Sequence, residues 1–249
     1  MFGQNQIRKK EQDGKTLQVH DLWYTLQGEG PFGGLPAVFL RLSGCTLSCF
    51  WCDTEWDDTK EYAEVDRVAQ ATVALLAYHR CSLLVITGGE PLRHRLSSYL
   101  ETLFFRAKED AGINRLVVQI ETSGSISDSC LFDPAIPHWS PDTDHGLYVV
   151  CSPKTPTLNR EVFERANCFK YVVSKDGVDS EDGLPIVSTQ EEGKSARIAR
   201  PRAHAPVYVS PCDTHEETST RENYALAGQL ALKHGYRLSL QMHKHVEQP

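Results

Sequence analysis

Apolar and polar positions along the 249-residue chain fall into two alternating patterns. Short apolar runs, which are typical of strands buried on both faces, recur along the chain. Between several of these runs, apolar residues recur at the spacing of an amphipathic helix. The predicted strands are 17–26, 37–42, 82–86, 116–120, 147–150, 169–173, 206–209 and 237–241, and the predicted helices are 62–80, 92–111 and 220–234.

Polar turns follow most of the predicted strands, at 87–91, 121–124, 152–154, 174–175 and 210–213. Strands that alternate with helical segments indicate an α/β fold with a parallel sheet. Such folds build their sites from the turns at the C-terminal ends of the strands. The pattern therefore predicts a partial (β/α) barrel of about six parallel strands, with the functional site at their C-terminal ends.

The remaining segments differ in composition. Residues 1–16 are polar and charged without periodicity, so we expect a flexible leader there. Residues 17–249 are enough for one α/β domain. Within that domain, 176–203 is rich in Gly, Asp, Glu, Ser and Arg, which predicts a polar excursion at the surface.

Charge and hydropathy exclude several classes of partner. The formal net charge of −7 and a hydrophobic content of 40% are typical of a soluble globular protein. A nucleic-acid partner is not expected, because binding the phosphate backbone needs clustered Lys and Arg. The chain has no apolar run of membrane-spanning length and no signal-peptide pattern, so we expect a cytoplasmic protein without a membrane partner.

The candidate chemistry begins with Cys45, Cys49 and Cys52, at C-x3-C-x2-C spacing. Thiolates suit zinc, copper(I) and iron–sulfur clusters, and three of them leave one iron of a cubane open to another ligand. The spacing i, i+4, i+7 is also that of a buried helix face. However, strand 37–42 runs straight into Gly44, which favours a loop, and clustered cytosolic thiols indicate ligation rather than disulfides.

Four further cysteines and one lysine are assigned by their surroundings. Cys81, Cys151 and Cys168 lie in apolar segments and are expected to be small buried hydrophobic residues, whereas Cys130 is expected in a polar turn. Lys170 lies inside an apolar strand, where an unpaired charge would cost several kcal/mol. We therefore expect its ammonium group to reach solvent or to pair with a carboxylate.

Two glycine-containing segments are candidates for ligand binding. In 27–34, glycines let the backbone approach a ligand, and Gln27 and Glu29 suit a nitrogen-rich heterocycle. An ordinary hairpin turn explains this segment equally well. Residues 87–91, Thr-Gly-Gly-Glu-Pro, follow a buried strand, where α/β folds place ligands. A plain turn would also use Gly and Pro, but it does not require Glu90.

These motifs together resemble one enzyme family. The three-cysteine spacing, with Gln27-Gly28-Glu29-Gly30 before it and Cys52-Asp53-Thr54 at its end, is similar to the 7-carboxy-7-deazaguanine synthases of the radical S-adenosylmethionine (radical SAM) superfamily. The resemblance implies a partial barrel of the radical SAM type and a step in queuosine biosynthesis. In that step, 6-carboxy-5,6,7,8-tetrahydropterin becomes 7-carboxy-7-deazaguanine with loss of ammonia.

The resemblance also implies cofactors and site residues. Cys45, Cys49 and Cys52 would hold a [4Fe–4S] cluster, S-adenosylmethionine would bind its open iron, and Thr54 would be a ligand of Mg²⁺. The implied pterin-binding residues are Leu26, Gln27, Gly28, Glu29, Arg41, Thr87, Gln241, His243 and the terminal carboxylate of Pro249. The implied S-adenosylmethionine-binding residues are Phe50, Trp51, Asp53, Gly88, Gly89, Glu90, Ser152, Pro153, Lys154, Ser210, Pro211, Cys212 and Asp213.

The chain departs from the family pattern at two positions. Ser210 stands where the family usually has Gln before Pro211, so backbone contacts are the safer expectation there. Met242 stands where the family has Thr. The resemblance further implies a reducing electron-transfer protein, such as a flavodoxin, as partner, and a homodimer.

Two other functions fit part of the pattern. An activase that installs a glycyl radical on a partner protein would share the cofactor, but it would need an open barrel face rather than a pterin pocket. A non-enzymatic zinc or cluster module would need a fourth ligand, for which His20 or Cys81 is available. It would leave the 87–91 motif without a role.

Overall fold

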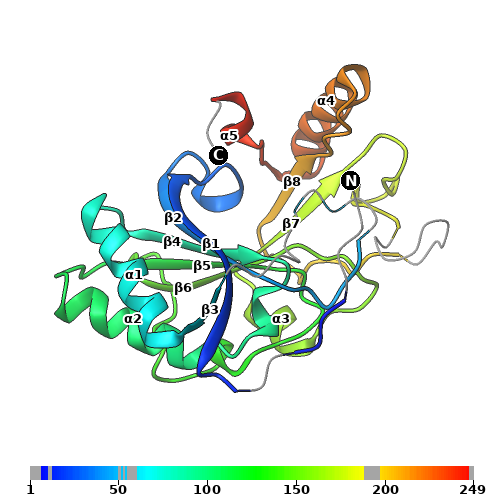
Figure 1. Ribbon diagram of the computed structural model, residues 1–249. Coiled ribbons are helices and arrows are strands. Elements are labelled where there is room, and N and C mark those ends of the chain that lie inside the picture. The colour runs from blue at the N-terminus through cyan, green and yellow to red at the C-terminus, as the bar shows by residue number, and fades with distance from the viewer. Residues whose placement is uncertain are drawn as a thin grey trace.

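The framework of the protein is one nine-stranded sheet (Figure 1). The computed structural model describes residues 7–10, 13–49, 52, 54, 61–187 and 197–246, without the side chain of His243. The strands are β1 (Thr16–Leu26), β2 (Pro36–Leu42), β3 (Glu61–Glu64), β4 (Leu83–Gly88), β5 (Val117–Thr122), β6 (Gly146–Cys151), β7 (Cys168–Val173), β8 (Val207–Pro211) and β9 (Arg237–Leu238).

The order of the strands across the sheet is β3-β1-β2-β4-β5-β6-β7-β8-β9. Strands β2 and β4 to β9, seven in all, run parallel, and β1 runs antiparallel to both β2 and β3. The outer strands are β3 and β9, so the sheet is not a closed barrel. The predicted α/β class with a mostly parallel, partial barrel is confirmed.

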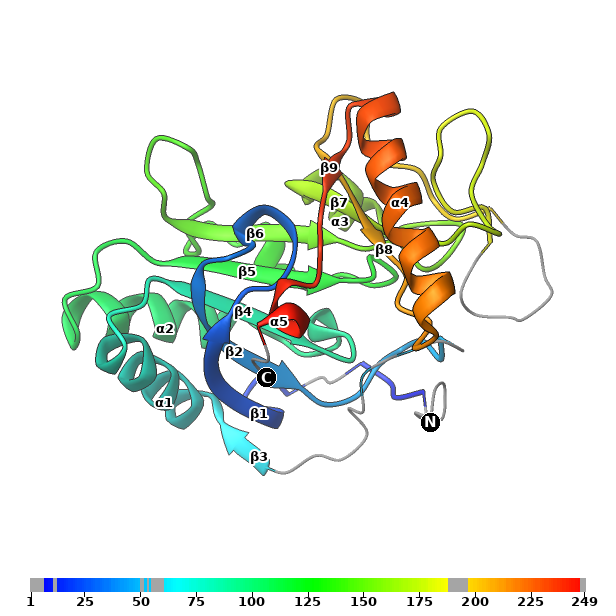
Figure 2. The same cartoon turned by 90° about the horizontal axis from the view of Figure 1, so that it is seen from above.

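Five α-helices accompany this sheet in the described part of the chain. They are α1 (Val65–Tyr78), α2 (Ser97–Glu109), α3 (Arg160–Arg165), α4 (Glu217–His234) and α5 (Met242–His245), with short 3-10 turns η1 (Gly30–Phe32), η2 (Pro91–Arg93) and η3 (Ser129–Leu131). Helices α1 and α2 lie side by side on one face of the sheet (Figures 1 and 2), and Arg106 of α2 binds Asp66 of α1 (Nη2 to Oδ1, 2.7 Å). No helix in the described part of the chain is long and apolar enough to cross a membrane.

The core lies between these helices and the sheet. Leu84, Val85 and Ile86 are successive residues of β4, and all three are fully buried. Because successive strand residues point to opposite faces, both faces of β4 are covered. This explains why β4 has an unbroken apolar sequence. The buried face of α1 carries Val68 and Leu76, as its helical spacing predicts.

Three predicted boundaries are wrong for local reasons. Residues 62–64, which we expected in a helix, belong to β3, because their backbone pairs with Thr16, Leu17 and Gln18 of β1. Helix α2 begins at Ser97 rather than at 92, because η2 follows Pro91 and its Leu92 N–H binds the Glu90 side chain. Of the last predicted strand, only Arg237–Leu238 pairs with β8.

Candidate active site

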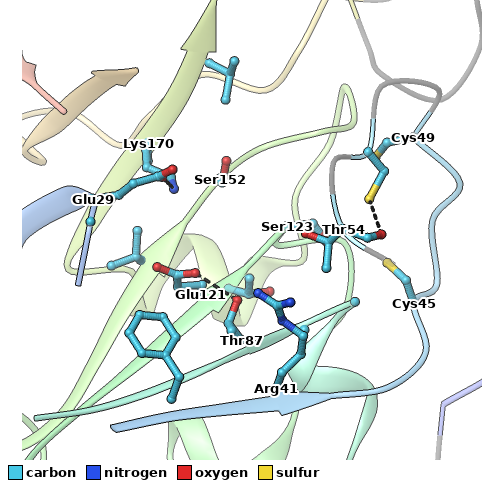
Figure 3. Close-up of a pocket in the computed structure, with 18 of the residues that line it drawn as sticks. Glu29, Arg41, Cys45, Cys49, Thr54, Thr87, Glu121, Ser123, Ser152 and Lys170 are labelled. Carbon is cyan, nitrogen blue, oxygen red and sulfur yellow. Dashed lines mark hydrogen bonds and ion pairs between the residues drawn. The ribbon is translucent and has the colours of Figure 1, made fainter. Parts of the chain in front are cut away.

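A cavity of about 330 Å³ opens at the C-terminal ends of the parallel strands (Figure 3). It brings together segments that the sequence analysis selected separately. The predicted site residues that line it are Leu26, Gln27, Gly28, Glu29, Arg41, Cys45, Cys49, Cys52, Thr54, Thr87, Gly88, Gly89, Ser152, Lys154 and Gln241. The two candidate ligand segments, 27–34 and 87–91, therefore meet the three cysteines in one place.

Other predicted site residues lie outside the lining of this cavity. Ser210 and Pro211 are buried at the end of β8, and the Cys212 N–H donates to the carbonyl of Val173 (2.9 Å). Asp213 lies in a second, more open hollow of about 580 Å³, where its carboxylate binds Lys244 (2.7 Å). Pro153 follows Ser152 without lining the cavity.

Some of the predicted site residues are not among those that the structure describes. Phe50, Trp51, Asp53 and Pro249 lie outside the described residues, as does the side chain of His243. The backbone of His243 belongs to α5.

The loop after β2 and the loop after β4 touch at glycine positions. The Glu90 N–H donates to the Gly44 carbonyl (3.0 Å), and a Cβ at Gly89 would lie 2.3 Å from that same oxygen. At Gly88, where φ is +142°, a Cβ would lie 2.0 Å from the Leu42 carbonyl oxygen. Only glycine allows this approach, so the glycine pair sets the cysteine loop beside the end of β4.

The three thiols fit a group that needs several thiolates. Burial, followed by the negative charge of Glu90, Cys49 and Cys52, raises the pKa of Cys45 to about 12. A cation that replaced the thiol proton would relieve this cost, which is what iron does in clusters. Among the described residues, no His, Cys, Asp and Glu side chains are grouped in metal-binding geometry. Instead, Cys45 Sγ accepts from Leu47 N (3.4 Å), and Cys52 Sγ lies 3.5 Å from the Thr54 carbonyl oxygen.

Glu90 lies fully buried behind the glycine pair, and protein donors surround its carboxylate. Oε1 accepts from Thr122 Oγ1 (2.7 Å) and Leu92 N (3.1 Å), and Oε2 accepts from Ser123 N (2.9 Å) and Ser123 Oγ (2.5 Å). Burial raises its pKa, and these hydrogen bonds offset part of the effect. The side chain therefore joins the ends of β4 and β5 beneath the cysteine loop.

Glu121, at the end of β5, is a charged residue of the cavity that sequence reasoning did not assign to the site. Its Oε1 accepts from Gln27 Nε2 (3.1 Å) and Gln119 Nε2 (2.9 Å), and its Oε2 accepts from Thr87 Oγ1 (3.0 Å). Figure 3 shows Glu121 next to Thr87 in the cavity. The sequence feature that identifies Glu121 as a candidate is its carboxylate at the start of the predicted polar turn 121–124.

Arg41 projects from β2 into the cavity, with its guanidinium 5.0 Å from the Trp23 ring centroid (Figure 3). Its Nε–H is buried and has no hydrogen-bond partner within the described part of the protein. A buried guanidinium donor costs free energy unless it is paired. This donor therefore points to an anionic ligand.

The predicted pairing of Lys170 is confirmed. Its ammonium group forms an ion pair with Glu29, and both side chains are mostly buried, at 13% and 15% exposed. The two charges compensate each other inside the cavity, so neither adds a net charge to it.

The proposed fourth ligands of a structural metal module do not join the cysteines. Cys81 Sγ donates to the carbonyls of Pro36 and Leu83, at the N-terminal ends of β2 and β4. Cys45 follows the opposite, C-terminal end of β2. His20 lies in β1 and does not line the cavity.

The comparisons agree with these motifs. No protein-family model matches the chain. A curated 7-carboxy-7-deazaguanine synthase from Rhodospirillum rubrum is 39% identical over 98% of this chain and 98% of its own length. The one from Rickettsia prowazekii is 32% identical over 98% and 94%, and the one from Escherichia coli K12 is 29% identical over 92% and 97%.

A structural comparison supports the fold. The crystal structure of QueE from Escherichia coli matches with a TM-score of 0.57 at 23% identity, over 92% of this chain and 95% of that one. At this identity the match establishes the fold alone. The full-length sequence identity establishes more, and this chain belongs to the 7-carboxy-7-deazaguanine synthase family, whose members are radical SAM lyases.

Proposed function

We propose that this chain converts 6-carboxy-5,6,7,8-tetrahydropterin to 7-carboxy-7-deazaguanine with loss of ammonia. The observation that supports the proposal is the cavity itself, whose lining includes both the three cysteines and Arg41. Cys45, Cys49 and Cys52 would hold a [4Fe–4S] cluster with S-adenosylmethionine beside it, and this pair would supply the radical chemistry. The protein orients the substrate and excludes water.

Arg41 binds the carboxylate of the substrate in this proposal. A guanidinium can hold a carboxylate through two parallel hydrogen bonds, and the buried Nε–H of Arg41 is available for one of them. The guanidinium lies over the Trp23 ring, and this contact limits its rotation. The substrate carboxylate therefore determines which way the pterin ring faces.

Glu121 binds the nitrogen-rich ring. Its two oxygens offer about four acceptor positions. Gln27, Gln119 and Thr87 use three of them. The remaining one is on Oε2, and it accepts an N–H from the substrate. Glu29 and Lys170 also line this cavity. Because the two charges pair with each other, they add no net charge next to the ring.

S-adenosylmethionine binds at the C-terminal ends of β4 and β6. Gly88, Gly89, Ser152 and Lys154 line the cavity next to the cysteines, which supports this assignment. Glu90 supports the same loop from behind. The remaining assignments are those of the resemblance: Phe50, Trp51, Asp53, Pro153, Ser210, Pro211, Cys212 and Asp213 for this cofactor, and His243 and Pro249 for the pterin.

Mg²⁺ binds at Thr54. The ion keeps several waters and needs few protein ligands, and Thr54 lines the cavity two residues after Cys52. Thr54→Ala should therefore weaken the dependence of turnover on Mg²⁺ while the cluster remains. Identical Mg²⁺ titration curves for the variant and the wild type would contradict this assignment.

The protein works as a cytoplasmic homodimer, in which residues 17–249 form one radical SAM domain reduced by a flavodoxin-like donor. Light scattering tests the dimer, and turnover with a purified flavodoxin system in place of dithionite tests the donor. A monomer in the first measurement, or no turnover in the second, would contradict the respective assignment.

Arg41 gives the sharpest test of the proposed function. Arg41→Met should raise KM for the pterin by about 100-fold, because it removes a charged, paired contact of about 3 kcal/mol. Cleavage of S-adenosylmethionine without pterin should be unchanged. Arg41→Lys keeps the charge without the planar guanidinium, so its KM for the pterin should lie between those of the wild type and Arg41→Met. An unchanged KM for the pterin in Arg41→Met would contradict the assigned substrate position.

A further inference from the structure

Residues 7–10 run along the cysteine loop. Ile7 pairs with Cys45 in an isolated parallel bridge, and the Arg8 N–H donates to the Cys45 carbonyl (2.7 Å). Residues Ile7, Arg8 and Lys9 are exposed. The contact with Cys45 is therefore made by backbone and depends little on the identity of these side chains.

The same segment has a second anchor. The Lys10 ammonium group donates to the carbonyl of Ser127, in the loop after β5. Two residues earlier in that loop, Ser125 Oγ lies 3.3 Å from Thr46 Oγ1, which directly follows Cys45. Residues 7–10 thus bridge two loops that already contact each other. One loop carries Cys45, and the other follows Ser123, which binds Glu90.

This arrangement distinguishes Cys45 from the other two cysteines. Cys45 is only 8% exposed, whereas Cys49 and Cys52 are half-buried. A hydrogen bond to the backbone of a ligand residue restricts the orientation of its side chain, and such outer contacts affect how tightly a metal group is held. Residues 7–10 therefore contact the least solvent-exposed of the three cysteines.

We propose that residues 7–10 form a strap that positions Cys45 and slows the loss of iron from the cluster. The proposal rests on the proposed function, because it requires the cluster. It adds the N-terminal segment, which composition alone suggests is a flexible leader, to the structure that supports the cofactor.

One pair of variants isolates the backbone contact. Arg8→Pro removes the N–H that binds Cys45, and Arg8→Ala removes the same side chain but keeps the N–H. The proline ring also occupies the space of the lost hydrogen bond, so Arg8→Pro disrupts the backbone approach to Cys45 as a whole. Lys10→Met removes the second anchor, and Lys9→Met, at an exposed neighbour, is its control.

The measurement is the anaerobic rate of iron release from the reconstituted holoenzyme to a coloured chelator. Release should be about fivefold faster in Arg8→Pro than in Arg8→Ala, the factor expected for one backbone hydrogen bond. It should also be faster in Lys10→Met than in Lys9→Met. The melting temperatures of the cluster-free proteins should agree within each pair.

Equal release rates within the Arg8 pair would overturn the strap. So would a lower melting temperature of cluster-free Arg8→Pro that accounts for its faster release. A wild-type protein that binds no iron and sulfide would overturn the proposed function as well, so the two failures can be told apart.

Discussion

Lys170, in the middle of β7, forms an ion pair with Glu29 in the loop between β1 and β2, although 141 positions separate them in the sequence. The β1–β2 loop is also held by the bond from Gln27 to Glu121 in β5 and by the Gly30 N–H, which donates to Ser239 Oγ (2.8 Å). These contacts fix the loop against the inner face of the sheet. The loop therefore closes one side of the substrate cavity.

The Glu29–Lys170 pair should reveal itself in a double-mutant cycle. Lys170→Met removes the ammonium partner of a mostly buried carboxylate and should lower the free energy of unfolding by about 3 kcal/mol. Glu29→Gln should cost a similar amount, and the double variant should cost clearly less than the sum. Denaturant unfolding of the cluster-free proteins measures this. Strictly additive losses would show that the two charges do not interact.

The cysteines offer a matched pair for the cluster. Cys49→Ala should abolish the brown colour and the cleavage of S-adenosylmethionine, because the cluster loses a ligand. Cys130→Ala should keep both. Cys130 is wholly buried in η3, not in an exposed polar turn, so its replacement should cost about 1 kcal/mol of stability. A full complement of iron and sulfide in active Cys49→Ala would refute the ligand assignment.

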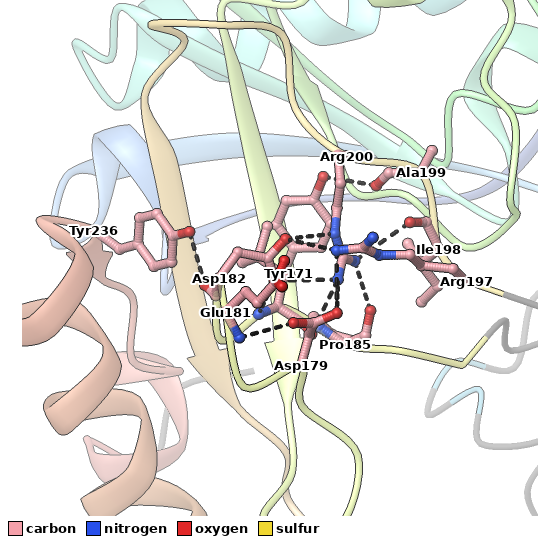
Figure 4. Close-up of polar contacts among 11 residues, drawn as sticks. Tyr171, Asp179, Glu181, Asp182, Pro185, Arg197, Ile198, Ala199, Arg200 and Tyr236 are labelled. Atoms are coloured by element: carbon pink, nitrogen blue, oxygen red, sulfur yellow. Dashed lines mark hydrogen bonds and ion pairs between the residues drawn. The ribbon is translucent and has the colours of Figure 1, made fainter.

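The described part of the 176–203 excursion is anchored by Arg200 (Figure 4). Its guanidinium binds Asp182 through two bonds (Nε to Oδ2, 2.7 Å; Nη2 to Oδ1, 3.1 Å) and the Pro185 carbonyl through Nη1 (2.7 Å). Asp182 is tied to the segment after α4, because the Tyr236 hydroxyl donates to its carbonyl (2.8 Å). The excursion therefore connects β7 with the end of α4.

Arg200→Met should lower the free energy of unfolding by about 2 kcal/mol, since it removes three hydrogen bonds to partly buried acceptors. Arg197→Met is the control, because Arg197 also binds Asp179 and Asp182 but its side chain is 53% exposed. Exposed ion pairs contribute about 0–1 kcal/mol. Equal destabilisation by the two variants, measured by denaturant unfolding, would contradict the role given to Arg200.

The C-terminal segment leads back to the cavity. The Met242 N–H donates to the Gly28 carbonyl (3.0 Å), Gln241 lines the cavity, and Lys244 binds Asp213. These contacts bring residues 241 and 242 to the cavity. The resemblance implies that the terminal carboxylate of Pro249, which lies outside the described residues, accepts paired N–H groups from the amino-pyrimidinone edge of the pterin.

Extension beyond Pro249 should therefore raise KM for the pterin strongly. It should leave the binding of S-adenosylmethionine nearly unchanged, and a tag placed before Met1 serves as the control. Steady-state kinetics of the two tagged proteins decide the matter. Wild-type kinetics in the C-terminally extended enzyme would exclude the carboxylate from the site.

The sequence predicts those features that depend on local patterns. The apolar run around Leu84 identifies a buried strand because both faces of β4 are covered, and the three-cysteine spacing identifies a loop that lines the cavity. The glycine pair at Gly88 and Gly89 marks a close approach that the structure contains. In each case the signal lies within a few residues of the feature.

Contacts between distant segments could not be predicted in this way. Lys170 required a carboxylate, but nothing near it in the sequence identifies Glu29. Glu121 gains its place in the site from Gln27 and Thr87, which reach it from other strands and loops. Tyr62 fits a helical pattern, yet it pairs with Gln18 because β1 offers a free edge there. Tertiary pairing outweighs local pattern at these positions.

The most direct test of the proposed function is a stoichiometric anaerobic turnover of the reconstituted wild-type protein. The reaction contains 6-carboxy-5,6,7,8-tetrahydropterin, S-adenosylmethionine, Mg²⁺ and a reductant, and its products are quantified by mass spectrometry and an ammonia assay. One molecule of 7-carboxy-7-deazaguanine should form for each molecule of ammonia released. Cleavage of S-adenosylmethionine by a fully loaded protein, with neither ammonia nor the deazapurine formed, would contradict the proposal.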